Sequence, residues 1–328
     1  MRRFMTILIA LVPVAIGAVA VVAAVAAAGS VLLICNKTDD TVSFVDATTL
    51  EVLGTTTTGR GPHEVATTPD GKWGFVSNYE GSGNTISLID IHQMEEVRKI
   101  SIDPHRAPHG ILVNNDGTKV YATCENTKTI IELDIKIEKI TRSFKTNANV
   151  SHMLVLTPDE KKIYVANIGS GSVTVIDMAD NKIKQIKTDD GCEGMDITPD
   201  GRHVWAGNGA ADNISIIDTE TDEVVETVVC KGFPIRVKAT PDGKHVLVSC
   251  ATANEVAVFD AETYEEKARI NTGTAPIGVL VAPDGKRAYV ANTRANTVTV
   301  LDLEKWEVIG KIKAGNTPDG LGFATVGE

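Results

Sequence analysis

A tandem unit of about forty residues constrains the fold of this chain more than any other sequence feature. A short apolar strand pattern that ends in aspartate recurs at successive spacings of 44, 44, 43, 41, 42 and 42 residues. The seven aspartates are Asp46, Asp90, Asp134, Asp177, Asp218, Asp260 and Asp302. Such a period is typical of repeat proteins, in which each unit buries its apolar face only against its neighbours. We therefore expect one repeat domain, although 328 residues would suggest two domains by length.

A second motif, Pro-Asp-Gly or a close variant, divides the units. It occurs six times, at Asp70, Asp116, Asp159, Asp200, Asp242 and Asp284. Asp-Gly after proline favours a tight turn, and an apolar strand pattern stands on each side of it. With the strand that ends in aspartate and a polar strand after it, each unit contains four short strands. The sequence thus predicts an all-β fold, a seven-bladed β-propeller with four-stranded antiparallel blades.

The ends of the repeat region predict how the ring closes. The region begins with a second-strand pattern, VLLICN, and ends with a first-strand pattern, TPDGLGFATV. These terminal strands should therefore share one blade, which leaves no free sheet edge at the join. We expect the propeller to occupy residues 31–328.

Residues 1–30 have the pattern of a targeting segment. Two arginines after Met1 precede an uncharged stretch from Phe4 to Ser30, which is rich in alanine, valine, isoleucine and leucine. A basic start, an apolar run and an Ala-rich end predict a secretory signal peptide. The run is also long enough to remain as an N-terminal membrane anchor, which is the alternative. Either way we expect an extracytoplasmic location: periplasmic, secreted or at the cell surface.

Charge and cysteine content exclude several classes of protein. The net charge is −11 and no basic stripe is present, so nucleic acid is not an expected partner. The five cysteines include no CxxC pair, so neither a zinc ribbon nor a dense disulfide framework is indicated, and at least one thiol stays unpaired within a monomer. Phosphate-binding loops, nucleophile elbows and c-type haem motifs are missing from the sequence.

The repeats resemble the YVTN-type β-propeller repeats of exported bacterial and archaeal proteins, a group that overlaps the YncE-like propellers. The resemblance is carried by IYVAN (163–167), AYVAN (288–292), the PDGK turns and the VxVID strands, and it covers essentially everything after residue 30. It implies an exported seven-bladed propeller. Because the family is functionally mixed, it implies little about chemistry.

One position of the repeat carries an unusual set of side chains. The residue seven before each turn aspartate should open the innermost strand of its blade. Around the ring this position holds His63, His109, His152, Glu193, Ile235 and Ile277, with Asp319 as the counterpart in the shared blade. Innermost strands line the central channel, so these side chains should converge. Imidazole and carboxylate are suitable ligands for a divalent Zn, Mn, Fe, Cu or Ni ion, and we predict metal ligands at His63, His109, His152 and Glu193.

Residues after the second strands should reach the same face. Glu125 could act as a general base and Tyr79 as an acid, and both are candidate catalytic residues. The candidate ligand-binding residues are Arg236, Asn78, Asn167 and Arg294. Arg236 would pair with an anionic group of a ligand. An asparagine repeated from blade to blade is also explained by bonds to turn backbone within each blade.

Two functions are compatible with these observations. The first is a propeller with a His-rich pocket at the central channel that binds a divalent metal ion and a small polar ligand. If catalytic, it would be a metal-dependent hydrolase or lyase. The second is a non-catalytic scaffold that presents its loops to an envelope protein partner. A metal-free, pH-sensitive pocket is a further alternative for the histidines. The sequence leaves open whether the protein is an enzyme, and a membrane would be contacted only through an uncleaved N-terminal segment.

Overall fold

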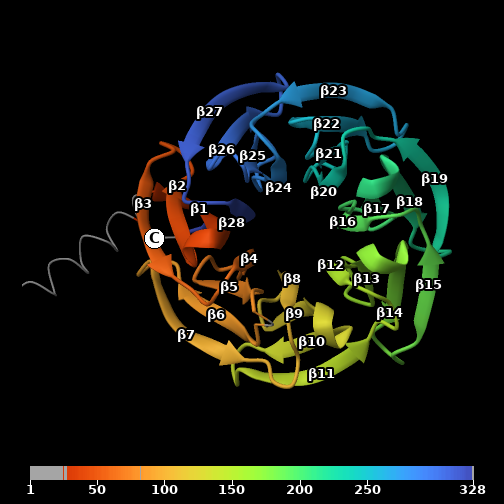
Figure 1. Cartoon of the computed structure of the whole chain (residues 1–328), viewed down its shortest axis with the longest axis horizontal. Helices are drawn as coiled ribbons and strands as arrows, with labels where there is room; N and C mark the ends of the chain where they lie inside the picture. The colour runs from red at the N-terminus through yellow and green to blue at the C-terminus, as the bar shows by residue number, and fades with distance from the viewer. Residues whose placement is uncertain (1–24, 26–27, 82, 327–328) are drawn as a thin grey trace, which may run out of the picture.

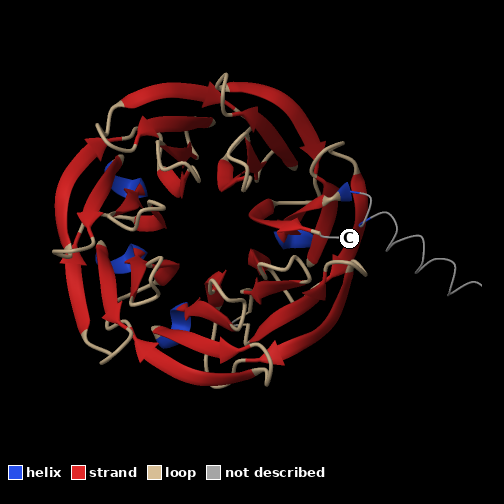
Figure 2. Ribbon diagram, turned by 180° about the vertical axis from the view of Figure 1, so that it is seen from behind, coloured by secondary structure: helices blue, strands red, loops and turns tan. Residues whose placement is uncertain are grey.

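The computed structural model describes residues 25, 28–81 and 83–326. Within these residues the strands form seven four-stranded antiparallel sheets arranged as a ring (Figure 1), which confirms the predicted seven-bladed propeller. The innermost strand of each blade faces the central channel and the outermost strand lies on the rim. Figure 2 shows the same ring from behind.

Six blades are continuous in sequence, and their strands run from the channel to the rim in chain order. Blade 1 contains β4 (Pro62–Thr67), β5 (Trp73–Asn78), β6 (Thr85–Asp90) and β7 (Glu95–Ser101). Blade 2 contains β8 (Pro108–Val113), β9 (Lys119–Cys124), β10 (Thr129–Asp134) and β11 (Lys139–Lys145). Blade 3 contains β12 (Ser151–Leu156), β13 (Lys162–Asn167), β14 (Ser172–Asp177) and β15 (Ile183–Lys187).

The second half of the ring repeats this arrangement. Blade 4 contains β16 (Cys192–Ile197), β17 (His203–Asn208), β18 (Asn213–Asp218) and β19 (Glu223–Val229). Blade 5 contains β20 (Pro234–Ala239), β21 (His245–Cys250), β22 (Glu255–Asp260) and β23 (Glu266–Asn271). Blade 6 contains β24 (Pro276–Val281), β25 (Arg287–Asn292), β26 (Thr297–Asp302) and β27 (Glu307–Lys313).

The closing blade joins the two ends of the propeller, as predicted. It contains β28 (Pro318–Thr325), β1 (Ser30–Asn36), β2 (Thr41–Asp46) and β3 (Val52–Thr57). Strands β28 and β1 pair antiparallel from Ser30 opposite Thr325 to Asn36 opposite Pro318. Short 3-10 helices follow the second strand in four blades: η1 (Lys37–Asp39), η2 (Glu125–Thr127), η3 (Ile168–Ser170) and η4 (Gly209–Ala211).

Burial explains why the second and third strands are apolar throughout. Strand β13 is buried at every position after its first, and β14 is buried at every position before its last. Both faces of a middle strand pack against adjacent blades, so the usual alternation of polar and apolar residues is lost. The rim strand β7 is mostly exposed, which agrees with its Glu, Arg and Lys residues.

The two features that recur in each repeat of this chain are turns. In the Pro-Asp-Gly turn of blade 1, Asp70 Oδ1 accepts a hydrogen bond from Lys72 N at 3.0 Å, and Gly71 has a φ of 70°, a conformation that favours glycine. At the rim of the closing blade, Asp46 Oδ1 accepts bonds from the backbone N of Thr48 and Thr49. These bonds explain why the third strand of each unit ends in aspartate.

Most of the predicted targeting segment lies outside the described residues, so its assignment stays a prediction. Of residues 1–30, the structure describes Val25 and residues 28–30. In the part of the chain that is described, no helix has the length and apolar character needed to cross a membrane.

Candidate functional site

The repeat frame places the predicted residues in one layer at the end of the channel where the innermost strands begin. His63, His109 and His152 are the second residues of β4, β8 and β12, three consecutive blades. Glu193 occupies the same position in β16, and Asp319 occupies it in β28. All three imidazoles are buried. We call these five residues, with Lys37, Glu64, Tyr79, Glu125 and Arg236, the histidine layer.

The three imidazole rings stack around His109. The ring centroids of His109 and His152 lie 3.4 Å apart with an interplanar angle of 32°, and those of His63 and His109 lie 3.8 Å apart. His63 Nε2 and His109 Nε2 are 3.1 Å apart. The centroids of His63 and His152 are 6.2 Å apart, so His109 is the residue that the two outer imidazoles share.

The two candidate catalytic residues contact the layer from the loops after the second strands. Tyr79 Oη donates a hydrogen bond to Glu125 Oε2 at 2.7 Å. The other oxygen of that carboxylate, Oε1, lies 2.5 Å from His152 Nδ1. On the opposite side of the ring, His152 Nε2 is 3.2 Å from Glu193 Oε1. The side chains thus form a continuous chain from Tyr79 through Glu125 and His152 to Glu193.

A lysine occupies the opposite side of the layer. Lys37 Nζ, from η1, lies 2.7 Å from His63 Nε2 and 3.6 Å from Asp319 Oδ2. Asp319 Oδ2 is itself 3.5 Å from His63 Nε2. The ammonium group therefore contacts both His63 and Asp319.

An ion pair spans the channel directly behind the histidines. Arg236, buried on β20, donates a hydrogen bond from Nη2 to Glu64 Oε1 on β4, and the two residues are 172 positions apart in sequence. Arg236 also lies near Glu193, at 3.7 Å, and Asp319, at 4.0 Å. Glu64 was not among the residues predicted from the sequence. The repeat places Glu64 and Arg236 at the same position of blades 1 and 5 with opposite charges, but it does not determine that the two side chains meet across the channel.

Burial and charge set the protonation of the layer. Burial lowers the pKa of His109 well below its ordinary value, and the nearby His152 and His63 act in the same direction. Burial also disfavours the charged form of His152, but the carboxylates of Glu125 and Glu193 on its two sides outweigh burial and raise the pKa of His152. Burial and the Glu125 carboxylate together raise the pKa of Tyr79. His109 is therefore neutral and able to offer a lone pair.

Several buried polar atoms in the layer have no hydrogen-bond partner. They are His63 Nδ1, His109 Nδ1, His152 Nε2 and Asp319 Oδ1. Two groups of side chains have donor atoms within 4.8 Å of one another: His63, Glu64 and His109, and His109, Glu125 and His152. Both groups include His109. Glu193, predicted as a fourth ligand, belongs to neither group and contacts His152 instead.

The other predicted ligand-binding residues are not brought into the layer. Asn78 is buried within blade 1, where Nδ2 donates to Thr85 Oγ1 and Ser87 Oγ. Asn167 makes an equivalent bond to Thr174 Oγ1 in blade 3. Each asparagine also bonds to backbone, since Asn78 Oδ1 accepts from Gly59 N and Asn167 Nδ2 donates to Ser172 O. Backbone bonds of this kind were the structural alternative for the repeated asparagine, and most of the bonds described here go to hydroxyl side chains instead. Arg294 is exposed in the loop after β25.

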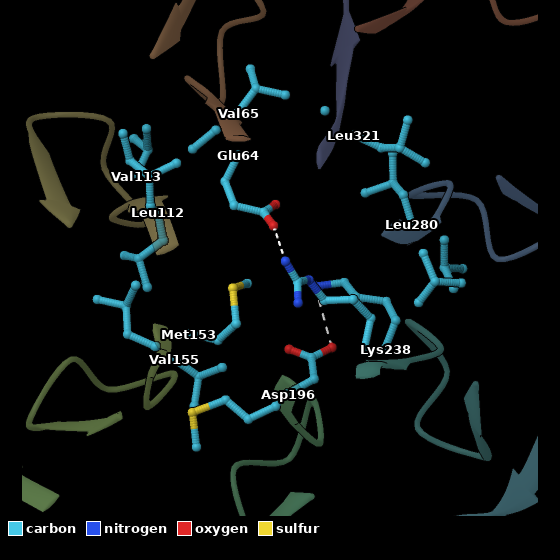
Figure 3. Close-up of a pocket in the computed structure, with 18 of the residues that line it drawn as sticks. Glu64, Val65, Leu112, Val113, Met153, Val155, Asp196, Lys238, Leu280 and Leu321 are labelled. Atoms are coloured by element: carbon cyan, nitrogen blue, oxygen red, sulfur yellow. Dashed lines mark hydrogen bonds and ion pairs between the residues drawn. The ribbon is translucent and has the colours of Figure 1, made fainter. Parts of the chain in front are cut away.

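The central channel holds a separate cavity of about 470 Å³. Glu64 and Arg236 belong to its lining, and the three histidines do not. Figure 3 shows Glu64 with the apolar side chains of Leu112, Met153 and Leu280 around the cavity, and the pair formed by Asp196 and Lys238. The three histidines lie at the mouth of the channel where the innermost strands begin, and Glu64 and Arg236 lie between them and the rest of the cavity lining. The predicted His-rich pocket stays a prediction.

Comparisons with known proteins agree with this architecture. A family model for the YNCE-like beta-propeller matches residues 3–106 and 101–283. No curated protein matches the chain. Among solved structures, hydrazine synthase from Kuenenia stuttgartiensis is 25% identical, with 83% of this chain and 92% of that chain covered and a TM-score of 0.74. A functionally unknown protein from Desulfotomaculum acetoxidans DSM 771 is 15% identical over 90% of this chain and 99% of that chain, with a TM-score of 0.77, and shows the fold alone. By its family match and its seven four-stranded blades, this chain belongs to the YncE-like β-propeller family.

Proposed function

We propose that this protein binds a divalent transition-metal ion in the histidine layer, through His63, His109 and His152 with Glu64 or Glu125 as carboxylate donors. The observation that carries the proposal is the meeting of three buried imidazoles from consecutive blades, with Nδ1 of His63 and Nδ1 of His109 left without a hydrogen bond. A buried polar atom without a partner is costly, and a bound ion would satisfy several at once.

The charge of the layer supports the same proposal. Four carboxylates, those of Glu64, Glu125, Glu193 and Asp319, face the two permanent cations Lys37 and Arg236. Uncompensated charge is expensive in a buried site. With His152 neutral, as a metal ligand must be, two negative charges are in excess, and a divalent ion would balance them. Borderline ions such as Zn²⁺ suit a donor set of imidazole and carboxylate.

The second part of the proposal concerns a small polar ligand. Lys37 and Tyr79 are only partly buried, so they form the side of the layer that solvent can reach. An anionic group that binds the metal from this side would meet the ammonium of Lys37 and the hydroxyl of Tyr79. If the site is catalytic, Glu125 lies where a base could act on a metal-bound molecule, which would give hydrolase or lyase chemistry. Export of the protein remains part of this proposal.

Metal analysis tests the proposal directly. Untagged protein would be stripped with chelator, loaded with Zn²⁺ or Co²⁺, desalted and analysed for metal, beside a variant with His63, His109 and His152 changed to alanine. We expect near-stoichiometric metal in the wild type and a loss of at least tenfold in the variant. A matched control changes His203 and His245, two histidines on other strands, and should retain the metal. Equal, substoichiometric metal in all three proteins would refute the site.

A second variant separates loss of the metal site from loss of the fold, which the triple variant alone would not do. His109→Gln keeps the side-chain volume and hydrogen-bonding capacity while removing the nitrogen shared by both donor groups. Circular dichroism and the thermal midpoint would verify its fold. The Co²⁺ absorption of a histidine-ligated ion should then disappear from a folded protein.

A further inference from the structure

Two of the five cysteines meet at the join between blade 4 and blade 5. Cys230 follows β19 at the rim of blade 4, and Cys250 is the last residue of β21 in blade 5. Their Sγ atoms lie 3.6 Å apart, and both side chains are fully buried. All five cysteines are buried free thiols in the structure, and Cys35, Cys124 and Cys192 lie on other strands.

The equivalent positions in other blades show that this pair is unusual. The residue after each rim strand donates its backbone N–H to the residue before the third strand, as Thr58 does to Asp40 and Cys230 does to Asp212. At the join between the closing blade and blade 1, Asn78 stands in the place of Cys250. Its Oδ1 accepts a bond from Gly59 N, and its Nδ2 donates to Ser87 Oγ.

At the join between blades 1 and 2, apolar residues replace the polar residues Thr58, Asn78 and Ser87. There Cys124 takes the place of the asparagine, and Ile102 and Ile131 fill the positions of the threonine and the serine, so bulky side chains surround a single thiol. In blade 5 the third-strand position holds the small Ala257, and the residue facing Cys250 is a second cysteine. The space around the two sulfur atoms is therefore not filled by bulky aliphatic groups as it is in blade 2.

We propose that Cys230 and Cys250 form a disulfide bond that joins blade 4 to blade 5. A disulfide has a sulfur–sulfur distance of about 2.05 Å, so closure needs the two sulfur atoms to approach by roughly 1.5 Å. The bond would close a loop of about twenty residues that contains β20, the strand that carries Arg236.

The surroundings indicate how the bond would form. The hydrogen bond from Cys230 lowers the pKa of Cys250, burial opposes this, and Arg269 lowers the pKa further. Because Arg269 favours a thiolate at Cys250, we take Cys250 as the attacking group. A surface cavity of about 490 Å³ is lined by Lys231, which follows Cys230, and by Thr252 and Ala253, two and three residues after Cys250. Both cysteines are buried, so this cavity marks the side from which a small disulfide would approach the pair.

The exchange balances with a disulfide as oxidant. The Cys250 thiolate attacks one sulfur of an oxidant of the glutathione-disulfide or protein-disulfide class, which forms a mixed disulfide and releases one oxidant thiolate. Cys230 then loses its proton and attacks the Cys250 sulfur, which releases the second oxidant thiol. Two protein thiols are oxidised by two electrons in total, and the oxidant disulfide is reduced to two thiols.

Counting thiols in the full chain tests the proposal. Reduced protein would be equilibrated in glutathione buffers of increasing oxidised fraction, denatured in acid, alkylated with N-ethylmaleimide and weighed intact. We expect the alkylated thiols to fall from five to three. Trypsin should then yield a reducible link between peptides 203–231 and 245–267, each of which contains one of the two cysteines. Five free thiols at every oxidised fraction, or a link between other cysteines, would overturn the proposal.

Two single variants and a control complete the test. Cys230→Ala and Cys250→Ala should each keep all four remaining thiols in oxidising buffer, whereas Cys124→Ala should still lose two. The oxidised wild type should also unfold at a higher temperature than the reduced protein, and this difference should vanish in Cys250→Ala. Loss of two thiols in Cys230→Ala would contradict the assignment, and so would an unchanged midpoint in oxidised wild type. These outcomes do not depend on metal binding.

Discussion

Replacement of Arg236 by methionine tests whether the ion pair behind the histidines stabilises the ring. The guanidinium is buried, is bonded to Glu64 Oε1, and lies within 4.0 Å of carboxylate oxygens of Glu193 and Asp319. Methionine fills much of the same volume but leaves these carboxylates without their cation. Removal of one partner from a buried pair typically costs about 3–5 kcal/mol, and we expect a loss of this size in the free energy of unfolding.

The assay is urea unfolding of metal-free protein at pH 7, followed by tryptophan fluorescence and circular dichroism. A double-mutant cycle with Glu64→Gln separates the pair from general damage to the core. The Glu64→Gln change alone should cost less, because Arg236 keeps Glu193 and Asp319 as partners. We expect a coupling energy of about 1–3 kcal/mol between the two sites. A cost below about 1 kcal/mol for Arg236→Met, or a coupling energy near zero, would refute the reasoning.

Three further predictions follow from other contacts. Lys37→Met should tighten Zn²⁺ binding by roughly tenfold in a chelator competition, because the ammonium that occupies the position beside His63 Nε2 is removed; weaker binding would contradict the proposed ion position. Gly194→Ala should destabilise the protein by about 1–3 kcal/mol in urea, since its Cβ would lie 2.3 Å from Ile235 O, whereas Gly54→Ala, which meets only the flexible end of Met94 at 3.2 Å, should cost much less. Burial would raise the pKa of Glu132, but bonds to Thr141, Lys119 and Tyr121 outweigh it and lower that pKa. The ionised Glu132 thus stabilises the fold above its unfolded pKa near 4.3, and this stabilisation is lost as the pH falls through its folded pKa. Glu132→Gln should therefore weaken the dependence of the unfolding free energy on pH in acid. An unchanged pH dependence would refute this.

The repeat fixed the position of some residues of the histidine layer, and side-chain packing fixed the contacts of the others. His63, His109, His152 and Glu193 share one repeat position, so their common level in the channel followed from symmetry. Which donor atoms approach one another did not, because it depends on side-chain rotamers and on the loops that bring in Lys37 and Glu125. Asn78 and Arg294 have the right position in the repeat but point to other partners or to solvent.

The repeated aspartates, the Pro-Asp-Gly turns and the unpaired terminal strand patterns determined the all-β ring and its closure, because local turn chemistry and strand periodicity recur in every unit and each unit needs its neighbours to bury its apolar faces. Only the tertiary structure decided that Glu64 reaches Arg236 across the channel, that this pair separates the histidines from the cavity, and that Cys230 meets Cys250. Each of these contacts joins residues from different blades, and their geometry depends on how closely the blades approach, which no local pattern encodes.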